Sequence, residues 1–270
     1  AGVAEGRRRL LLAALAALLA ACPSAHALSD VGFRLNVPGY RVGQIGPCEV
    51  EPASSVIHEG FFQNGEAKDH QHPQQLATAM RARMGARLQS GGVQRDDECS
   101  LILGVSPEDV GDLERCVVAV AELSMQPRNG RVPSNFRPPA RSRPSAEPLV
   151  AYICNVAVTR AHRQRGLARA LMCVCEEVAR SVWACDELYL HVDGRNRAAL
   201  RLYRSLGYEA LRHWDVPQWK EDCLGLVPNR YHRKVISPDP LYTPLEDDMA
   251  THVQPNSEPL GFAAPRLADA

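Results

Sequence analysis

The chain lacks an excess of charge of either sign. Its 270 residues contain 31 lysines and arginines and 31 aspartates and glutamates. Proteins that bind nucleic acid carry a basic surface that attracts the phosphate backbone, so this balance argues against nucleic acid as a partner. With 45% hydrophobic residues, the chain is long and apolar enough for one domain with a substantial core.

Cysteine is present, but a paired arrangement of cysteines is missing. The nine cysteines are an odd number, and none belongs to a C-x-x-C pair of the zinc-binding type. Cys173 and Cys175 are two positions apart on a predicted helix, so their thiols point in different directions. The sequence therefore favours buried, apolar thiols over disulfides, and it predicts no metal site.

A hydrophobic run long enough to remain as a membrane span is also missing. Residues 10–21 are apolar, but this run is short for a bilayer. It follows three arginines and precedes a small-x-small site that ends at Ala27, which is the order found in signal peptides. We therefore predict a targeting segment over residues 1–38. A bipartite plastid address and a plain secretory signal both fit it, although an odd set of cysteines suits an oxidising compartment poorly.

Residues 152–168 combine an apolar strand, a short turn and the start of a helix. Gly166 and Ala168 leave little side chain between the backbone and an anion, and the first turn of a helix has N–H groups without intrahelical acceptors. Arg163 and Arg165 add positive charge at the same place. This combination predicts a cradle for a pyrophosphate group.

Further motifs follow in a fixed order. Apolar residues recur at helical spacing over residues 167–182, and residues 188–192 form a second apolar strand. Asn196 comes next, and residues 202–208 have the pattern L-Y-x-x-x-G-Y.

Together, the motifs Y-I-x-N-V-A-V, R-x-x-G-x-A, Asn196 and L-Y-x-x-x-G-Y resemble the GCN5-related N-acetyltransferase (GNAT) superfamily. The pattern R-x-x-G-x-A alone arises often by chance, but the resemblance rests on all four motifs in order over residues 149–210. The first motif is most similar to the plastid acetyltransferases of plants and algae that modify protein amines.

The resemblance implies an α/β fold (mixed α+β), with a central, mostly antiparallel twisted sheet of about seven strands and helices on both faces. We expect this domain over residues 39–236. Outside the motifs, the hydrophobic pattern predicts further elements. These are a first strand over 40–45 and 48–51, strands at 100–105, 116–124, 208–214 and 230–236, and helices at 54–62 and 72–89.

Two segments are poor in core-forming residues. Residues 127–148 contain six prolines and five arginines, which predicts a solvated loop. A mobile arm that attracts acidic protein substrates is the alternative. Residues 237–270, with six prolines and six acidic residues against one arginine, predict a disordered acidic tail.

The resemblance also implies acetyl-CoA as the donor substrate and no metal. Backbone N–H groups of the first strand would hold the pantetheine arm as an added strand would, and the turn would bind the pyrophosphate. Asn196, implied to touch the coenzyme arm, is equally a good helix N-cap. The implied cofactor-binding residues are Val156, Ala157, Val158, Arg163, Gln164, Arg165, Gly166, Leu167, Ala168 and Asn196.

The catalytic residues that the resemblance implies are Tyr203 and Glu122. Tyr203 would donate a proton to the leaving thiolate, with a purely structural core tyrosine as the alternative. Glu122 could accept the amine proton through a water molecule, or it could be a solvent-facing carboxylate at a strand end. His191 and His213 are further candidate bases, although a lone histidine on an apolar strand is more often structural.

The predicted activity is transfer of an acetyl group to a protein amine, either an N-terminal α-amino group or a lysine. An α-amino group, with a pKa near about 8, needs only a weak base at neutral pH. Acetylation of a small-molecule amine and a non-catalytic acyl-CoA-binding module remain alternatives. The expected partner is a protein or peptide amine, with no nucleic acid and no stable membrane span in the mature form.

Overall fold

The computed structural model describes residues 33–61, 73–90, 92–109, 116–133, 148–212, 215 and 228–239. Most of the predicted targeting segment, most of the proline- and arginine-rich loop and nearly all of the predicted tail lie outside these residues. The domain boundaries at residues 39 and 236 therefore stay predictions.

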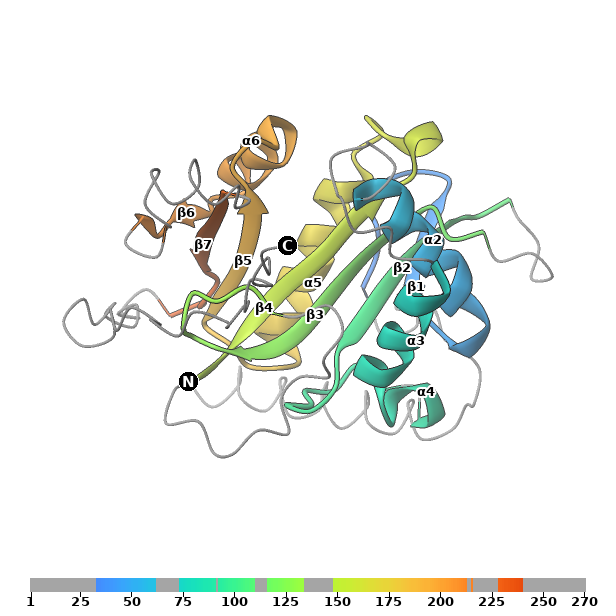
Figure 1. Cartoon of the computed structure of the whole chain (residues 1–270), viewed down its shortest axis with the longest axis horizontal. Helices are drawn as coiled ribbons and strands as arrows, with labels where there is room; N and C mark the ends of the chain where they lie inside the picture. Colours follow the sequence, from blue (N-terminus) through green and yellow to red (C-terminus); the bar gives the residue numbers. More distant parts are fainter. Residues whose placement is uncertain are drawn as a thin grey trace, which may run out of the picture.

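The fold is built on one seven-stranded sheet (Figure 1). All neighbouring strands are antiparallel except β4 and β5, which run parallel. The predicted mostly antiparallel sheet is thus confirmed, and the one parallel pair makes it mixed. In spatial order the strands are β1 (Tyr40–Gln44), β2 (Leu101–Pro107), β3 (Ala119–Pro127), β4 (Leu149–Val158), β5 (Glu187–Asp193), β7 (Asn229–Val235) and β6 (Glu209–Ala210).

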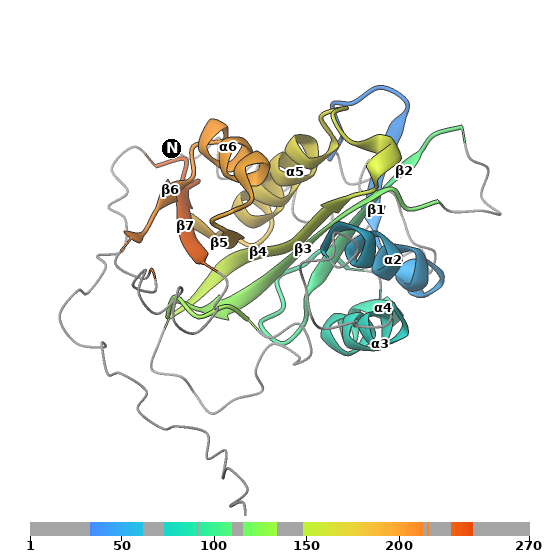
Figure 2. The ribbon, with the colours of Figure 1, turned by 45° about the horizontal axis from the view of Figure 1, so that its top comes forward.

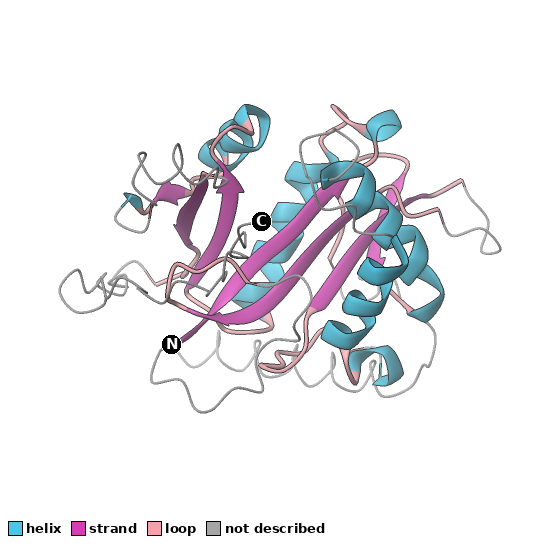
Figure 3. Ribbon diagram, in the orientation of Figure 1, coloured by secondary structure: helices cyan, strands magenta, loops and turns pink. Residues whose placement is uncertain are grey.

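Helices cover both faces of the sheet, as predicted (Figures 2 and 3). One face carries α5 (Leu167–Ser181) and α6 (Arg197–Ser205), and the other carries α2 (Val50–Phe61), α3 (Pro73–Met84) and the short α4 (Arg87–Ser90). Two 3-10 turns, Pro47–Glu49 and Arg160–His162, precede α2 and α5.

The two faces bury separate hydrophobic clusters. Leu167, Leu171, Val174 and Val178 form the apolar stripe of α5, and they pack on β3, β4 and β5 in the larger cluster. On the opposite face, α2 and α3 pack on one half of the sheet. The other half of that face carries an aromatic cluster instead. Its buried members are Val150, Tyr152, Tyr189, Leu211 and Tyr231.

Three predicted elements differ from the observed ones. Residues 48–51 are helical rather than extended, because Pro47 starts a turn in which the Glu49 carboxylate accepts the Gly46 N–H at 2.8 Å. The predicted helix over 72–89 breaks at Gly85, whose φ of 49° is left-handed. The strand expected over 208–214 shrinks to the two residues of β6, and residues 213 and 214 lie outside the described part.

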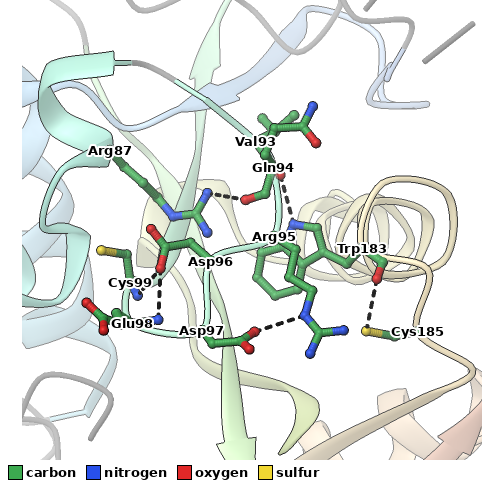
Figure 4. A network of polar contacts seen from close by, with 10 residues as sticks. All are labelled: Arg87, Val93, Gln94, Arg95, Asp96, Asp97, Glu98, Cys99, Trp183 and Cys185. Carbon is green, nitrogen blue, oxygen red and sulfur yellow. Dashed lines mark hydrogen bonds and ion pairs between the residues drawn. The ribbon is translucent and has the colours of Figure 1, made fainter. Parts of the chain in front are cut away.

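The segment between α4 and β2 ties the two helical layers together (Figure 4). The Arg87 guanidinium donates to the carbonyl oxygens of Gly92 at 3.1 Å and Gln94 at 2.6 Å. Between these residues, the carbonyl of Val93 accepts from Trp183 Nε1 at 2.8 Å, just past the end of α5. Arg87 also lies over the Trp183 ring at 5.6 Å. This segment therefore fixes α4 to the far end of α5.

Among the helices of the described residues, none has the length and apolar character needed to cross a membrane.

Candidate active site

The sheet opens between its two parallel strands. β4 and β5 are paired only over three residues of each strand, ending at Ile153 and Leu190. Beyond this point both strands continue, but they diverge (Figure 1). The β4 backbone from Asn155 to Val158 therefore has no partner in β5.

A β-bulge in β4 lies at the start of this opening. Opposite β3, Ala157 pairs with Val120 and Cys154 pairs with Glu122, so β4 has one more residue than β3 over this stretch. Asn155, inside the bulge, has a φ of 52°, a left-handed conformation that asparagine adopts more readily than most residues. A bulge of this kind bends its strand and re-aims the backbone.

The turn that follows β4 ends in the amino end of α5. Gln164 and Gly166 have φ angles of 60° and 83°, and Gly166 is the N-cap of the helix. A Cβ at Gly166 would approach no atom more closely than Val37 Cγ2 at 4.0 Å, so the backbone angle, and not crowding, favours glycine there. The first N–H groups of α5 have no intrahelical acceptors, and the helix dipole adds positive potential. The predicted anion cradle thus has the local geometry that it requires.

Both arginines of this turn lie against the turn itself. Arg163 Nε donates to the Val158 carbonyl at 3.1 Å, and Arg165 Nη1 donates to the Tyr40 hydroxyl at 2.8 Å. The Tyr40 hydroxyl in turn contacts His162 Nδ1 at 2.8 Å. Tyr40, on β1, thereby contacts two residues of the turn that lie more than a hundred positions later in the sequence. Sequence reasoning gave no indication of this contact.

Tyr203 extends from α6 into the larger core. Its side chain is 7% exposed, it packs edge-on against Tyr208, and no described residue hydrogen-bonds to its hydroxyl. Burial, together with the nearby Cys154 and Cys175 thiols, raises the pKa of Tyr203 to about 12. A phenol is protonated at neutral pH even at its ordinary pKa of about 10. Tyr203 can therefore act as a proton donor, although its raised pKa makes it a weaker acid than an exposed tyrosine.

Asn196 caps the helix that carries Tyr203. Its side-chain oxygen accepts the Ala199 N–H at 3.0 Å, which is the N-cap role. The amide nitrogen of the same side chain is not used in this bond, so ligand contact by Asn196 stays a prediction.

Tyr152 and His191 meet on the face of the sheet opposite α6. The Tyr152 hydroxyl lies 2.8 Å from His191 Nδ1, and His191 Nε2 lies 2.9 Å from the Gly130 carbonyl oxygen. Because a carbonyl only accepts, Nε2 carries the ring proton and Nδ1 accepts from the phenol. Burial lowers the pKa of His191 from 6.5 to about 4, with His232 adding to the effect and Gly130 opposing it. His191 is thus a neutral acceptor at physiological pH.

The sequence does not predict this tyrosine–histidine pair. His191 is one of several candidate bases in the sequence, whereas Tyr152 belongs there only to an apolar strand. The pair forms because Tyr152 aligns with Tyr189 in the parallel register, which places His191 two positions further along the same face. The sequence motif alone does not specify that register.

Glu122 is buried beneath α3, with 1% of its surface exposed. Arg83 Nε and Nη2 donate to its two carboxylate oxygens at 2.7 and 2.9 Å, and Asn155 Nδ2 donates to one of them at 2.7 Å. Burial opposes ionisation, but Arg83 and these hydrogen bonds outweigh it and lower the pKa of Glu122. Glu122 is therefore not a solvent-facing strand-end carboxylate. Its role as a catalytic base stays a prediction.

Within the described residues, no three His, Cys, Asp or Glu side chains are grouped closely enough to hold a metal ion.

The fold and these features define an α/β protein whose sheet opens between β4 and β5, beside the amino end of α5. The chain belongs to the acetyltransferase (GNAT) family, whose model matches residues 67–208.

Similarity to characterised plant proteins is local. The chain is 32% identical over 72 residues to GCN5-related N-acetyltransferase 4, chloroplastic, of Arabidopsis thaliana, which covers 27% of this chain and 24% of that protein. It is 41% identical over 59 residues to the N-terminal acetyltransferase A complex catalytic subunit NAA10 of Arabidopsis thaliana, covering 22% and 31%. The matched part thus spans less than a third of each relative's length.

Similarity to a solved structure extends over more of the chain but shows the fold alone. Apo FdhC, described as a nucleotide-linked sugar GNAT, matches with a TM-score of 0.50 and 10% sequence identity. The match covers 75% of this chain and 90% of that protein.

The buried histidine generates a prediction about stability. His191 has a lower pKa in the folded protein (about 4) than its ordinary 6.5, so its contribution to stability is full above pH 6.5 and is lost as the pH falls towards 4. This difference corresponds to roughly 3 kcal/mol at most. We expect the free energy of unfolding, measured with denaturant at pH 7 and pH 5, to fall less in His191→Gln than in the wild type. Equal pH dependence in both proteins would contradict this account.

Proposed function

We propose that the protein is an acetyl-CoA-dependent N-acetyltransferase that acts on a protein amine. The observation that carries this proposal is the opening between β4 and β5 directly beside the anion-binding start of α5, with the Tyr203 phenol at the same place. Membership in the acetyltransferase family supports it.

The donor would be held mainly by backbone groups. The pyrophosphate of the coenzyme fits the N–H groups at the turn, from Arg163 to Ala168, where the arginine charges assist. The pantetheine arm would replace β5 as the partner of β4 at Val156, Ala157 and Val158. An N–H group of this stretch would stabilise the negative charge that develops on the thioester oxygen.

The transfer itself needs one proton to leave the amine and one to reach the thiolate. The amine nitrogen forms a bond to the acetyl carbon, and the bond between that carbon and the coenzyme sulfur breaks. Tyr203 would protonate the departing thiolate. Its environment includes the Cys154 thiol, which lies on β4 where the strands part.

The Tyr152–His191 pair supports a path for the proton that the amine loses. The pair lies on the other face of the sheet from Tyr203. Acetyl-CoA and the substrate amine would therefore approach the opening from opposite faces of the sheet. The phenol oxygen of Tyr152 would take the amine proton, directly or through water, as it passes its own proton to His191 Nδ1. The Gly130 carbonyl accepts from Nε2 and raises the pKa of His191, so it would offset in part the burial that disfavours the resulting imidazolium.

A protein or peptide acceptor is favoured by the surface beside the opening. The end of α2 crosses β4 closely, since a Cβ at Gly60 would lie 3.0 Å from Ala157 Cβ. The next residue, Phe61, leaves 49% of its side chain exposed, and an exposed aromatic next to an active site suits a peptide side chain. Phe62, the residue that follows, lies outside the described residues. The matched relative NAA10 is named as an N-terminal acetyltransferase subunit.

The two other functions remain distinguishable alternatives. A small-molecule amine would need the same donor site without the peptide surface. A module that binds acyl-CoA without catalysis would not need the protonated Tyr203 or the Tyr152–His191 pair, so their presence argues against it.

A plastid location is proposed as well, because the matched GCN5-related relatives of Arabidopsis thaliana are described as chloroplastic. We expect immunodetection to find the protein inside isolated plastids, protected from added protease. Its recovery from the medium would instead support the secretory alternative.

Removal of the Tyr203 hydroxyl tests the proposed acid. In Tyr203→Phe we expect kcat for acetyl-CoA turnover to fall by about 10²-fold, with little change in coenzyme affinity by calorimetry. Tyr208→Phe is the matched control, because this neighbouring phenol packs edge-on against Tyr203 within the same core. Full activity in Tyr203→Phe would contradict the assignment.

The acceptor is tested with a panel of amines at fixed acetyl-CoA. The panel contains peptides with free α-amines, the same peptides with blocked α-amines and an internal lysine, and small polyamines. We expect peptides to give higher kcat/KM than small amines, with free α-amines preferred because they present more neutral amine at pH 7. Exclusive turnover of polyamines would favour the small-molecule alternative, and no turnover with any amine would contradict the enzyme proposal.

A further inference from the structure

Three polar side chains from three different elements, two of them buried and one half-buried, meet beneath the opening in the sheet. Arg83 comes from the last turn of α3, Glu122 from β3 and Asn155 from the bulge of β4. Arg83 is 5% exposed and Glu122 is 1% exposed. The three side chains thus form one continuous network from α3 to the bulge.

Within this network, each side chain fixes the orientation of the next one. Both Arg83 bonds to the carboxylate, at 2.7 and 2.9 Å, form the two-pronged pair that guanidinium and carboxylate groups favour. This pairing sets the rotation of the carboxylate, and one of its oxygens then accepts from Asn155 Nδ2 at 2.7 Å. An ionised carboxylate only accepts hydrogen bonds, so the nitrogen of the Asn155 amide must face it. Arg83 therefore orients Glu122, and Glu122 orients Asn155.

The end point of the network is the residue at which the β4 backbone changes direction. Asn155 has the left-handed φ of 52°, it lies in the one-residue bulge against β3, and it follows the last pair between β4 and β5 by two residues. A left-handed non-glycine residue at a bulge is strained and persists when its surroundings hold it. The side-chain bond to Glu122 is such a restraint.

Stability alone is a poor explanation for this ion pair. Removing two charges from water is costly, and buried ion pairs can often be replaced by apolar residues of similar volume without loss of stability. Their better supported role is to specify one geometry among several. Here the geometry that they specify is that of the bulge.

We propose that Arg83 and Glu122 are positioning residues that clamp Asn155 and so fix the β4 bulge whose backbone holds the thioester arm. This inference rests on the proposed function, because it assigns the bulge to coenzyme binding. It gives Glu122 a role that acts through Asn155, which differs from that of a base in contact with the amine.

Two double variants test whether Arg83 and Glu122 position Asn155 or only form an ion pair. In Arg83→Met/Glu122→Gln both charges are removed, but the new amide oxygen can still accept from Asn155. In Arg83→Met/Glu122→Leu the volume is similar and that acceptor is lost. Because the first variant keeps the acceptor but loses the arginine that orients it, we expect its kcat/KM for acetyl-CoA to fall by about threefold. In the second variant we expect kcat/KM to fall by about tenfold or more, mainly through KM.

A third variant tests whether the effect passes through Asn155. Asn155→Gly keeps the left-handed backbone angle accessible but removes the amide, and we expect a loss similar to that of the Leu-containing variant. Adding Asn155→Gly to Arg83→Met/Glu122→Leu should cause little further loss, because the clamp is already broken. Hydrogen exchange at residues 155–158 should be faster than in the wild type in each of these variants, with the smallest increase in Arg83→Met/Glu122→Gln.

The results distinguish failure of the positioning role from failure of the proposed function. If both double variants have equal kcat/KM and equal exchange at residues 155–158, the clamp is wrong. If both lose activity equally and the acidic limb of the kcat pH profile disappears, Glu122 is a base and not a positioning residue. If the wild-type protein neither binds coenzyme A nor turns over acetyl-CoA, the proposed function fails, and the exchange data still report whether the network holds the bulge.

Discussion

The feature on which the rest of the structure depends is one extra residue in β4. This residue lies between Cys154, which pairs with Glu122 of β3, and Ala157, which pairs with Val120 of β3. Beyond it, β4 no longer pairs with β5. A sheet that would otherwise be continuous therefore presents unpaired backbone in its interior. The same strand leads within a few residues to the amino end of α5. Backbone geometry alone thus places an unpaired strand edge beside a helix N-terminus, and we propose that these two features hold the coenzyme.

Side chains then give the opening two chemically different sides. Tyr203 belongs to the core beneath α5 and α6, where burial raises the pKa of its phenol. Tyr152 and His191 belong to the opposite face, where burial keeps the imidazole neutral. The proposed proton donor and the proposed proton acceptor therefore extend from opposite faces of the sheet. The proposed transfer uses both groups, because the thiolate gains one proton and the amine loses one.

The sequence predicted the parts of the fold that depend on local pattern. Apolar spacing located α5. Gly166 lies at the start of this helix as expected, but its left-handed φ of 83°, and not the lack of a side chain beside an anion, is what favours glycine in the structure. The contacts that it could not predict join distant segments. Arg83 and Glu122 are 39 residues apart, and nothing in either local pattern indicates a bidentate pair. The Tyr152–His191 contact depends on the register of two parallel strands. The apolar pattern over residues 208–214 predicts a longer strand than β6, which pairs with β7 only at Glu209 and Ala210.

The central claim is that the β4 edge beside the bulge binds the thioester arm of the coenzyme. Hydrogen exchange of the wild-type protein with and without acetyl-CoA measures this most directly. We expect slower exchange at backbone amides of residues 156–158 and in the first turn of α5 when acetyl-CoA is present, with little change in the distant strands β1 and β2. Unchanged exchange in both segments at saturating acetyl-CoA would contradict the account.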